Sequence, residues 1–219
     1  MKKTVILLMS ALAFTACGSD AETKEENKDN TSNKTEKTEV KTKSFSVVEG
    51  TQVIKWTGYK LAEKVPVTGE FKTFEFSGYK ESGTSVADLM TGANVDIDFA
   101  STKTGDESRD LKIVNHFFGT MTETSTITAT IDSMTGETEG TAKVTINMNS
   151  MSVTPSLSWK LDETNSFVLN GSINVPDWKA QPSLDSLNKV CEAKHKGEGD
   201  EAITWPDVSV SAYVQLDIK

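Results

Sequence analysis

Apolar and polar residues alternate one by one along several separate stretches of this chain. The clearest stretch runs from 208 to 218, where each even-numbered residue is apolar and the odd-numbered ones are serine, tyrosine, glutamine and aspartate. Because successive side chains of a β-strand point to opposite faces, such a stretch makes one dry face and one wet face. The same pattern recurs over 144–148 and 167–175. Repeated strands of this kind favour an antiparallel sandwich or barrel, and a dry inner face on every strand is what a closed barrel requires.

The chain offers too few crossover helices for a doubly wound α/β sheet, so the fold class that we predict is all-β. Apolar residues occupy odd positions up to Phe71 but even positions from Phe74, which predicts a bulge or bend near Lys72 and Thr73. A second change of phase, at 149–150, predicts a tight turn. The nine expected strands lie near Phe45–Glu49, Gln52–Tyr59, Val65–Phe76, Asn94–Ala100, Thr124–Ile131, Thr141–Asn149, Ser156–Leu161, Phe167–Val175 and Val208–Ile218.

Two segments have helical periodicity. The first runs from about Glu107 to Phe118, and its apolar face would seat it over one mouth of a barrel. The second runs from about Leu184 to Lys196, with Ser183 as the predicted N-cap and Gly197 as the stop. The buried stripe expected on this second helix consists of Leu184, Leu187, Val190 and Cys191.

The N-terminal region has the pattern of a lipoprotein signal. Two lysines precede a short apolar run, and residues 14–17 read as a lipobox that ends at Cys17. We predict a signal peptide over 1–16 and lipidation of Cys17, with an ordinary secretory signal cleaved after Ala16 as the alternative. Residues 17–43 are almost entirely polar and are expected to form a disordered tether, and residues 44–219 to form the folded domain. The expected location is the bacterial cell envelope, with the protein anchored by lipid to a membrane, at the periplasmic face or the cell surface.

Charge and motifs argue against several function classes. The formal net charge is −9, which disfavours nucleic acid as a partner. Cys191 would have no disulfide partner once Cys17 is acylated. The chain has no HExxH, CxxC or GxSxG motif and no glycine-rich phosphate loop, and neither His116 nor His195 sits in a metal-ligand spacing. We therefore expect no catalytic residue, no metal and no cofactor; a general base at His116 is the enzymatic alternative.

Arg109 is the single arginine of the protein and follows the strand expected at Asn94–Ala100. Its planar fork can hold two oxygens at once, which suits an anion-binding role. The structural alternative is that Arg109 and an acidic neighbour pin the helix to the strand. Alternation also places five aromatic residues in one interior, although periodicity alone does not separate a filled barrel from a hollow one. These five are Trp56, Phe71, Phe99, Trp159 and Phe167.

Taken together, these features resemble the YceI-like family of lipid- and polyisoprenoid-binding proteins. The resemblance rests on the order and spacing of weak motifs: 67–71 (VTGEF), the strand 95–99, Ser101 with Thr104 and Gly105, Arg109–Asp110, Phe117–Phe118 and 140–155. It implies an antiparallel lipocalin-like β-barrel of about eight strands, with one or two short helices at the barrel ends. It also implies a hydrophobic tunnel for an isoprenoid chain, with Arg109 as the contact for an anionic head. The expected tunnel wall consists of Trp56, Phe71, Phe99, Phe117, Phe118, Trp159 and Phe167.

The leading functional hypothesis is a membrane-anchored protein that sequesters or carries an isoprenoid, such as a quinone or polyprenyl lipid, or a similar long-chain lipid. It acts by reversible binding and is not an enzyme. The alternative is a surface lipoprotein whose barrel is a scaffold for protein interaction, which predicts an exposed apolar patch. The expected partners are the lipid and the membrane, and a homodimer stays open.

Overall fold

The computed structural model describes residues 43–122, 126–198 and 201–219. The predicted signal peptide (1–16), the lipidation site Cys17 and all but the last residue of the predicted tether (17–43) lie outside this part of the chain. Within it, no helix has the length and apolar character needed to cross a membrane.

The described residues form one antiparallel sheet of 12 strands. Along the sheet the strands follow the order β4-β5-β7-β8-β10-β11-β12-β2-β3-β6, while β1 pairs with β12 and β9 pairs with β8. Their bounds are β1 Phe45–Val47, β2 Val53–Lys60, β3 Val65–Phe71, β4 Phe74–Ser77, β5 Asn94–Asp98, β6 Thr102–Lys103, β7 Thr126–Gly136, β8 Glu139–Met148, β9 Met151–Val153, β10 Ser156–Leu161, β11 Ser166–Asn174 and β12 Asp207–Ile218.

The two ends of this strand order, β4 and β6, meet in space. Along the chain, β3 leads directly into β4, and β5 leads through the short turn Phe99–Ser101 into β6, so each pair forms one bent strand. Phe71 pairs with Thr102 on one side of the junction, and Phe74 pairs with Ile97 on the other. Between these two pairs, the amide of Lys72 donates to the carbonyl of Ser101 (3.2 Å), and the amide of Asp98 donates to the carbonyl of Thr73 (3.1 Å). The chain thus bends at 72–73, as predicted, while β3 and β4 stay paired with β6 and β5.

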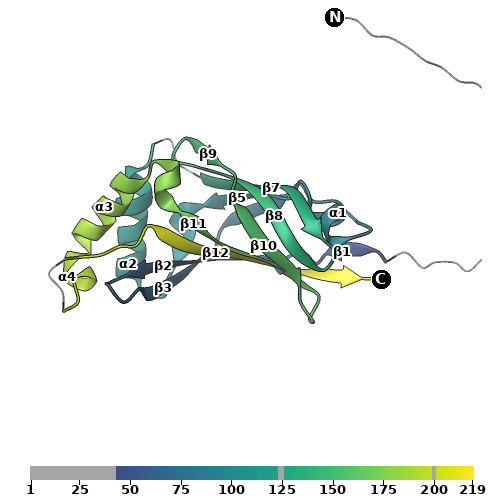
Figure 1. Cartoon of the computed structure of the whole chain (residues 1–219), viewed down its shortest axis with the longest axis horizontal. Helices are drawn as coiled ribbons and strands as arrows, with labels where there is room; N and C mark the ends of the chain where they lie inside the picture. Colours follow the sequence, from purple (N-terminus) through teal and green to yellow (C-terminus); the bar gives the residue numbers. More distant parts are fainter. Residues whose placement is uncertain (1–42, 123–125, 199–200) are drawn as a thin grey trace, which may run out of the picture. The chain divides into compact units, whose positions relative to one another are not determined.

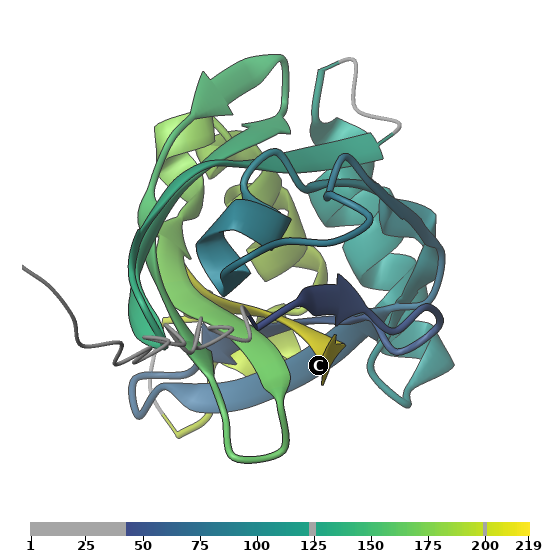
Figure 2. The same cartoon turned by 90° about the vertical axis from the view of Figure 1, so that its right-hand side faces the viewer.

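Counting β3–β4 and β5–β6 as one bent strand each reduces the ten strands of the main path to eight, and these eight close into a ring. Figure 2 shows this ring end on. The antiparallel barrel of about eight strands is therefore confirmed. The turn predicted at 149–150 is also present, since Asn149 and Ser150 both have positive φ between β8 and β9.

Short helices cover both ends of the barrel (Figure 1). At one end lies α1 (Val86–Met90), which sequence periodicity missed because it spans five residues. At the other end lie α2 (Glu107–Lys112), the π-helical turn η2 (Ile113–Phe117), the 3₁₀ turn η3 (Phe118–Thr120), α3 (Gln181–Val190) and α4 (Glu192–His195). Two further 3₁₀ turns are η1 (Phe99–Ser101), which joins β5 to β6, and η4 (Val175–Trp178), which precedes α3.

The second predicted helix needs two corrections. It starts three residues early, at Gln181, and it is interrupted at Cys191, which separates α3 from α4. Ser183 was expected to be the N-cap, but it lies inside α3 and is buried. Its hydroxyl accepts a hydrogen bond from Thr120 (2.8 Å), so tertiary packing against η3 uses the side chain that a cap would need.

Trp56 and Gly69 face each other on β2 and β3 and fix the interior near the bend. A Cβ at Gly69 would come within 2.4 Å of the Trp56 ring, so only glycine leaves room for this indole. The indole nitrogen in turn donates to the hydroxyl of Thr102 (3.0 Å), which is fully buried on β6. The side chain of Trp56 on β2 therefore packs against β3 and bonds to β6, so it links three strands.

We expect Gly69→Ala to lower the free energy of unfolding by about 1–3 kcal/mol, because the rigid indole must move and lose its bond to Thr102. The matched control is Gly58→Ala on the same sheet, where the new Cβ would meet the Trp56 ring at an ordinary 3.8 Å. That control should change stability by less than about 1 kcal/mol. Urea unfolding followed by tryptophan fluorescence measures both, and equal effects would contradict the role assigned to Gly69.

Candidate ligand-binding cavity

A cavity of about 300 Å³ occupies the interior of the barrel, which is within the size range of small-molecule sites. Its wall is built by the inward-facing residues that the alternation predicts. Each long strand contributes, as shown by Ile54, Ile97, Ile131, Ile146, Phe167 and Val210. The barrel is thus hollow, which periodicity alone did not decide.

Most of the aromatic residues expected in a tunnel wall do line this cavity. They are Trp56, Phe71, Phe117, Phe118 and Phe167, and Arg109 joins them. Phe99 and Trp159 do not line it. Phe99 stacks on Phe118 with ring centroids 4.9 Å apart, and Trp159 packs beside Phe167 while its indole donates to the carbonyl of Thr135 (2.9 Å). These two residues therefore pack against residues of the wall, Phe118 and Phe167, without lining the cavity themselves.

The helices add residues to the cavity that sequence reasoning had assigned to packing or left unassigned. Leu184, Leu187 and Cys191 line it from α3 and the break that follows, and His195 continues the same stripe on α4. The spacing of three and four residues was the available signal, since it extends the predicted stripe by one more turn to His195.

Basic side chains gather where these helices meet β2. Lys60, Arg109, Lys112 and Lys194 all border the cavity, although the protein as a whole is acidic. The ammonium group of Lys60 donates to the carbonyl of Lys194 at 3.4 Å. The wall of the cavity is therefore apolar along the strands and polar at this helical end.

Arg109 is not the pin between helix and strand. Its guanidinium lies 3.6 Å from Asp106, the N-cap of α2, so the ion pair stays within the first turn of its own helix. The backbone N–H of Arg109 donates to Asp106, and this bond, with the charges of Arg109 and Lys194, lowers the pKa of the Asp106 carboxyl. Half-exposed at the edge of the cavity, Arg109 remains within reach of a ligand.

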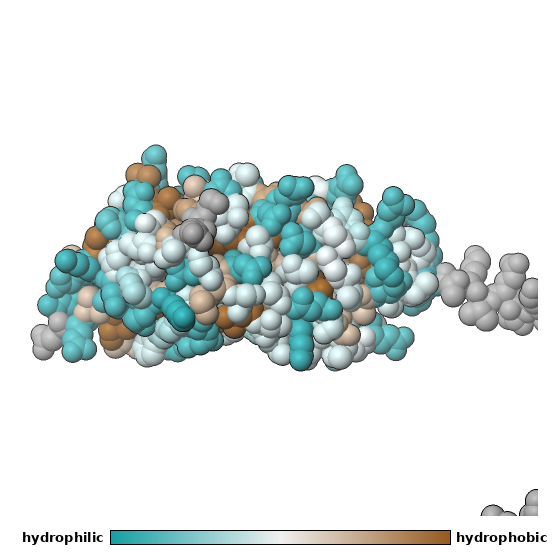
Figure 3. Space-filling model, turned by 90° about the horizontal axis from the view of Figure 1, so that it is seen from above, coloured by the Kyte–Doolittle hydropathy of each residue, from teal (hydrophilic) through white to brown (hydrophobic). Residues whose placement is uncertain are grey.

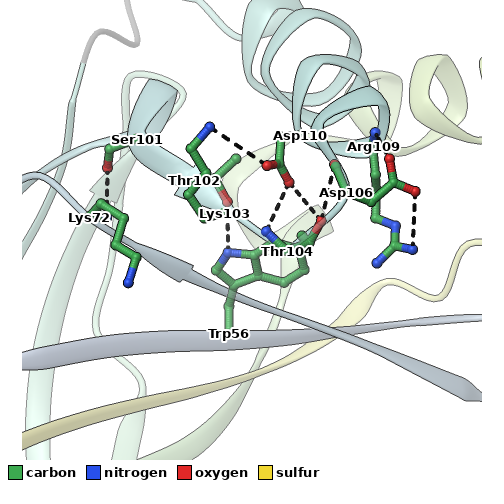
Figure 4. Close-up of polar contacts among 9 residues, drawn as sticks. All are labelled: Trp56, Lys72, Ser101, Thr102, Lys103, Thr104, Asp106, Arg109 and Asp110. Carbon is green, nitrogen blue, oxygen red and sulfur yellow. Dashed lines mark hydrogen bonds and ion pairs between the residues drawn. The ribbon is translucent and has the colours of Figure 1, made fainter.

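The pin is Asp110, the next residue (Figure 4). Its buried carboxylate accepts from the amide of Thr104 (2.9 Å) and from the hydroxyl of the same residue (2.6 Å). Lys103 on β6 lies 3.8 Å from it. These contacts hold α2 against the end of β6, so the acidic neighbour alone performs the structural role.

His195 is the titratable residue whose environment at the cavity is most perturbed. Its Nδ1 lies 2.8 Å from the hydroxyl of Thr204 and 3.3 Å from Oδ1 of Asn188. Burial first, and then the positive charges of Lys60 and Lys112, lower its pKa from 6.5 to about 4. The imidazole is therefore neutral at neutral pH.

The residues described do not assemble a recognisable catalytic or metal centre. No group of three or more His, Cys, Asp and Glu among them could hold a metal ion. His116, the candidate general base, lies in η2 and is not among the residues that line the cavity. The arrangement suits the enclosure of an apolar ligand with a polar end.

The low pKa of His195 makes stability depend on pH in a defined window. The unfolded chain takes up a proton near pH 6.5 and the folded one only near pH 4, so stability should fall as the pH drops from 6.5 towards 4. Replacing His195 by Asn should remove this part of the loss. Carboxylates whose pKa is lowered, such as Asp106 and Glu70, begin to contribute at about pH 5, but they are present in both proteins, so the difference between the two slopes reports His195. Urea unfolding at a series of pH values tests this, and identical slopes for the two proteins between pH 4 and 6.5 would contradict it.

Solved structures with the same fold extend over nearly the whole described domain. A polyisoprenoid binding domain from Saccharophagus degradans, implicated in plant cell wall breakdown, is 14% identical, with a TM-score of 0.53 over 80% of this chain and 97% of that one. Burkholderia cenocepacia BcnA is 16% identical, with a TM-score of 0.56 over 78% and 99%. No curated protein sequence matches the chain. The sequence profile of the YceI-like domain, however, matches residues 35–219. This chain therefore belongs to the YceI-like domain family, as its motifs indicated.

Proposed function

We propose that this protein binds an isoprenoid or a similar long-chain lipid in its barrel cavity and holds it reversibly without altering it. The observation that carries this proposal is the cavity itself, a hollow with an apolar wall inside a closed sheet. A filled barrel of the same sequence pattern would have no room for a ligand. The domain from S. degradans, which has the same fold, is described as polyisoprenoid binding, and this supports the choice of ligand class.

The energetics favour such a ligand. Each CH₂ group moved from water into an apolar wall contributes about 0.8 kcal/mol, so several isoprene units provide affinity without charged contacts. Water released from the apolar surface of the lipid chain supplies this free energy, and the wall of the cavity is already formed without a ligand. The polar head of the lipid would then lie at the helical end, beside the basic residues.

An anionic head would find Arg109 there, along with the lysines of β2, α2 and α4. The pairing of Arg109 with Asp106 lowers the net charge that this residue presents. We keep Arg109 as the contact for a head of that kind.

Membrane attachment completes the proposal and comes from the sequence. Lipidation of Cys17 and a polar tether over 17–43 would keep the barrel close to a membrane of the bacterial cell envelope. A lipid could then pass between bilayer and barrel over a short distance. Sequestration or transport of the lipid is the role that this arrangement suits.

The scaffold alternative receives less support. Large apolar side chains exposed among the described residues are Val48, Val65, Leu111 and Tyr213. Val48 follows β1, and the other three lie on β3, α2 and β12. On the face shown in Figure 3, apolar residues form scattered patches among hydrophilic and intermediate ones. A protein-binding surface of the ordinary kind needs a contiguous patch.

Solvent extraction and mass spectrometry of the purified protein, carrying Cys17→Ser so that it is not acylated, tests the proposal. A prenyl or other long-chain lipid bound in a ratio near one to one is the expected result. A protein that is empty and also takes up neither quinones nor polyprenols would overturn it.

A variant that fills the hollow sharpens this test. Ala129 lines the cavity from β7, and we expect Ala129→Phe to reduce lipid uptake at least tenfold, because the ring occupies the space of the chain. The control is Thr141→Phe, which places the same ring on the exposed face of β8. Thermal unfolding establishes that both variants fold. Equal lipid uptake by the two would contradict a binding site inside the barrel.

A further inference from the structure

We propose that Nε2 of His195 accepts a hydrogen bond from the head of the bound lipid, so that the cavity selects long-chain lipids that end in a hydroxyl group. The ligand class is thereby narrowed to prenols, prenyl phenols and similar compounds. The inference rests on the proposed function and adds to it the residue that reads the head group.

The hydrogen bonds around His195 fix which of its nitrogens carries the proton. The amide nitrogen of Asn188 donates to the carbonyl of Ala202 (2.7 Å), which sets the orientation of that side-chain amide. Its other atom, Oδ1, faces Nδ1 of His195 and can only accept. The proton of the neutral ring must therefore sit on Nδ1.

Thr204 completes the same assignment. Its hydroxyl donates to Oδ1 of Asn188 (2.9 Å), so the hydroxyl oxygen is left to accept the Nδ1 proton of His195 at 2.8 Å. The contacts among Nδ1 of His195, the Thr204 hydroxyl and Oδ1 of Asn188 then form one consistent set of donors and acceptors. The lone pair of the imidazole is on Nε2, and the low pKa described above keeps it there at neutral pH.

Nε2 is free to meet a ligand. It has no hydrogen-bond partner among the residues that the structure describes, and it is not sealed, because every fully buried side-chain nitrogen and oxygen in those ranges is bonded. His195 also lines the cavity. Since Nδ1 is held by Asn188 and Thr204, Nε2 is the ring nitrogen left to face a ligand.

The chemistry at this position favours one kind of head. A hydroxyl can donate to Nε2, and its oxygen can accept from a lysine such as Lys60 or Lys112, whose charges act on the same imidazole. A quinone carbonyl or an ether offers no proton, and an ionised phosphate places negative charge against the lone pair. The neighbouring lysines can only donate, so the lone pair of Nε2 is what separates a head that carries a proton donor from one that does not.

A pair of lipids that differ by one proton donor tests the proposal: a long-chain prenol and its methyl ether. We expect the Cys17→Ser protein to bind the prenol about tenfold more tightly, which corresponds to one hydrogen bond of ordinary strength. Competition against a fluorescent polyene probe measures both dissociation constants. If neither lipid binds, the proposed function fails rather than this inference.

Two substitutions separate the roles of the two ring nitrogens. His195→Asn keeps an amide donor near the position of Nδ1, preserves the contacts to Asn188 and Thr204, and has no atom at the position of Nε2. His195→Gln reaches the position of Nε2 with an oxygen that can accept. The Asn variant should lose the preference for the prenol with unchanged affinity for the ether, and the Gln variant should retain part of that preference.

Nitrogen NMR of the histidine ring provides a measurement that depends on no variant. The resonance of unprotonated Nε2 should shift when the prenol is added and stay in place when the ether is added. A preference that survives in His195→Asn would overturn the proposal. So would a prenyl phosphate that binds more tightly than the prenol and equally well to both variants, because the cations would then read the head.

Discussion

The hollow interior depends on the corner at Lys72 and Thr73, where one bent strand remains paired with another. Two backbone hydrogen bonds, from Lys72 to Ser101 and from Asp98 to Thr73, continue the pairing of β3 with β6 into that of β4 with β5, so no strand edge opens at the corner. The bend also resolves a problem of phase. It lets Phe71 and Phe74, at positions of opposite parity, both face the interior, so the wall continues around the ring. Trp56 above Gly69, bonded to Thr102, reinforces the sheet beside this corner.

A closed sheet supplies the wall, whereas the polar chemistry comes from the helical end. The inward faces of the strands are mostly apolar and provide affinity with little selectivity. Selectivity needs side chains that enter from outside these strand faces, and α2, α3 and α4 bring them. Asp110 fixes α2 to β6, while Asn188 and Thr204 hold His195 in one tautomer. This division suits a lipid, because its chain binds through buried apolar area and its polar head binds through directional hydrogen bonds.

Particular residues show how much of the structure the sequence pattern predicts. The strand Ser156–Leu161 was predicted with its observed bounds, and the bend at 72–73 followed from parity alone. The short elements α1, β6 and β9 were missed, because two to five residues carry too little periodicity. Ser183 has the identity of an N-cap but contacts Thr120, 63 positions away, and sequence does not contain that pairing. Arg109 and Asp110 were both noted, and tertiary contacts gave the structural role to Asp110.

The sequence by itself determined an antiparallel all-β fold, because alternation constrains which side chains face inward, and the order of its motifs indicated the family and with it the barrel. Alternation named Trp56, Phe71 and Phe167 of the aromatic wall, and the family resemblance added Phe117 and Phe118. Only the tertiary structure decided that the barrel is hollow, since the volume left between facing strands depends on closure and on how side chains meet. It also decided that His195, Thr204 and Asn188 form one network at the cavity. This network joins α3 and α4 to the segment that precedes β12, and sequence periodicity within one helix or strand does not predict a contact between separate elements.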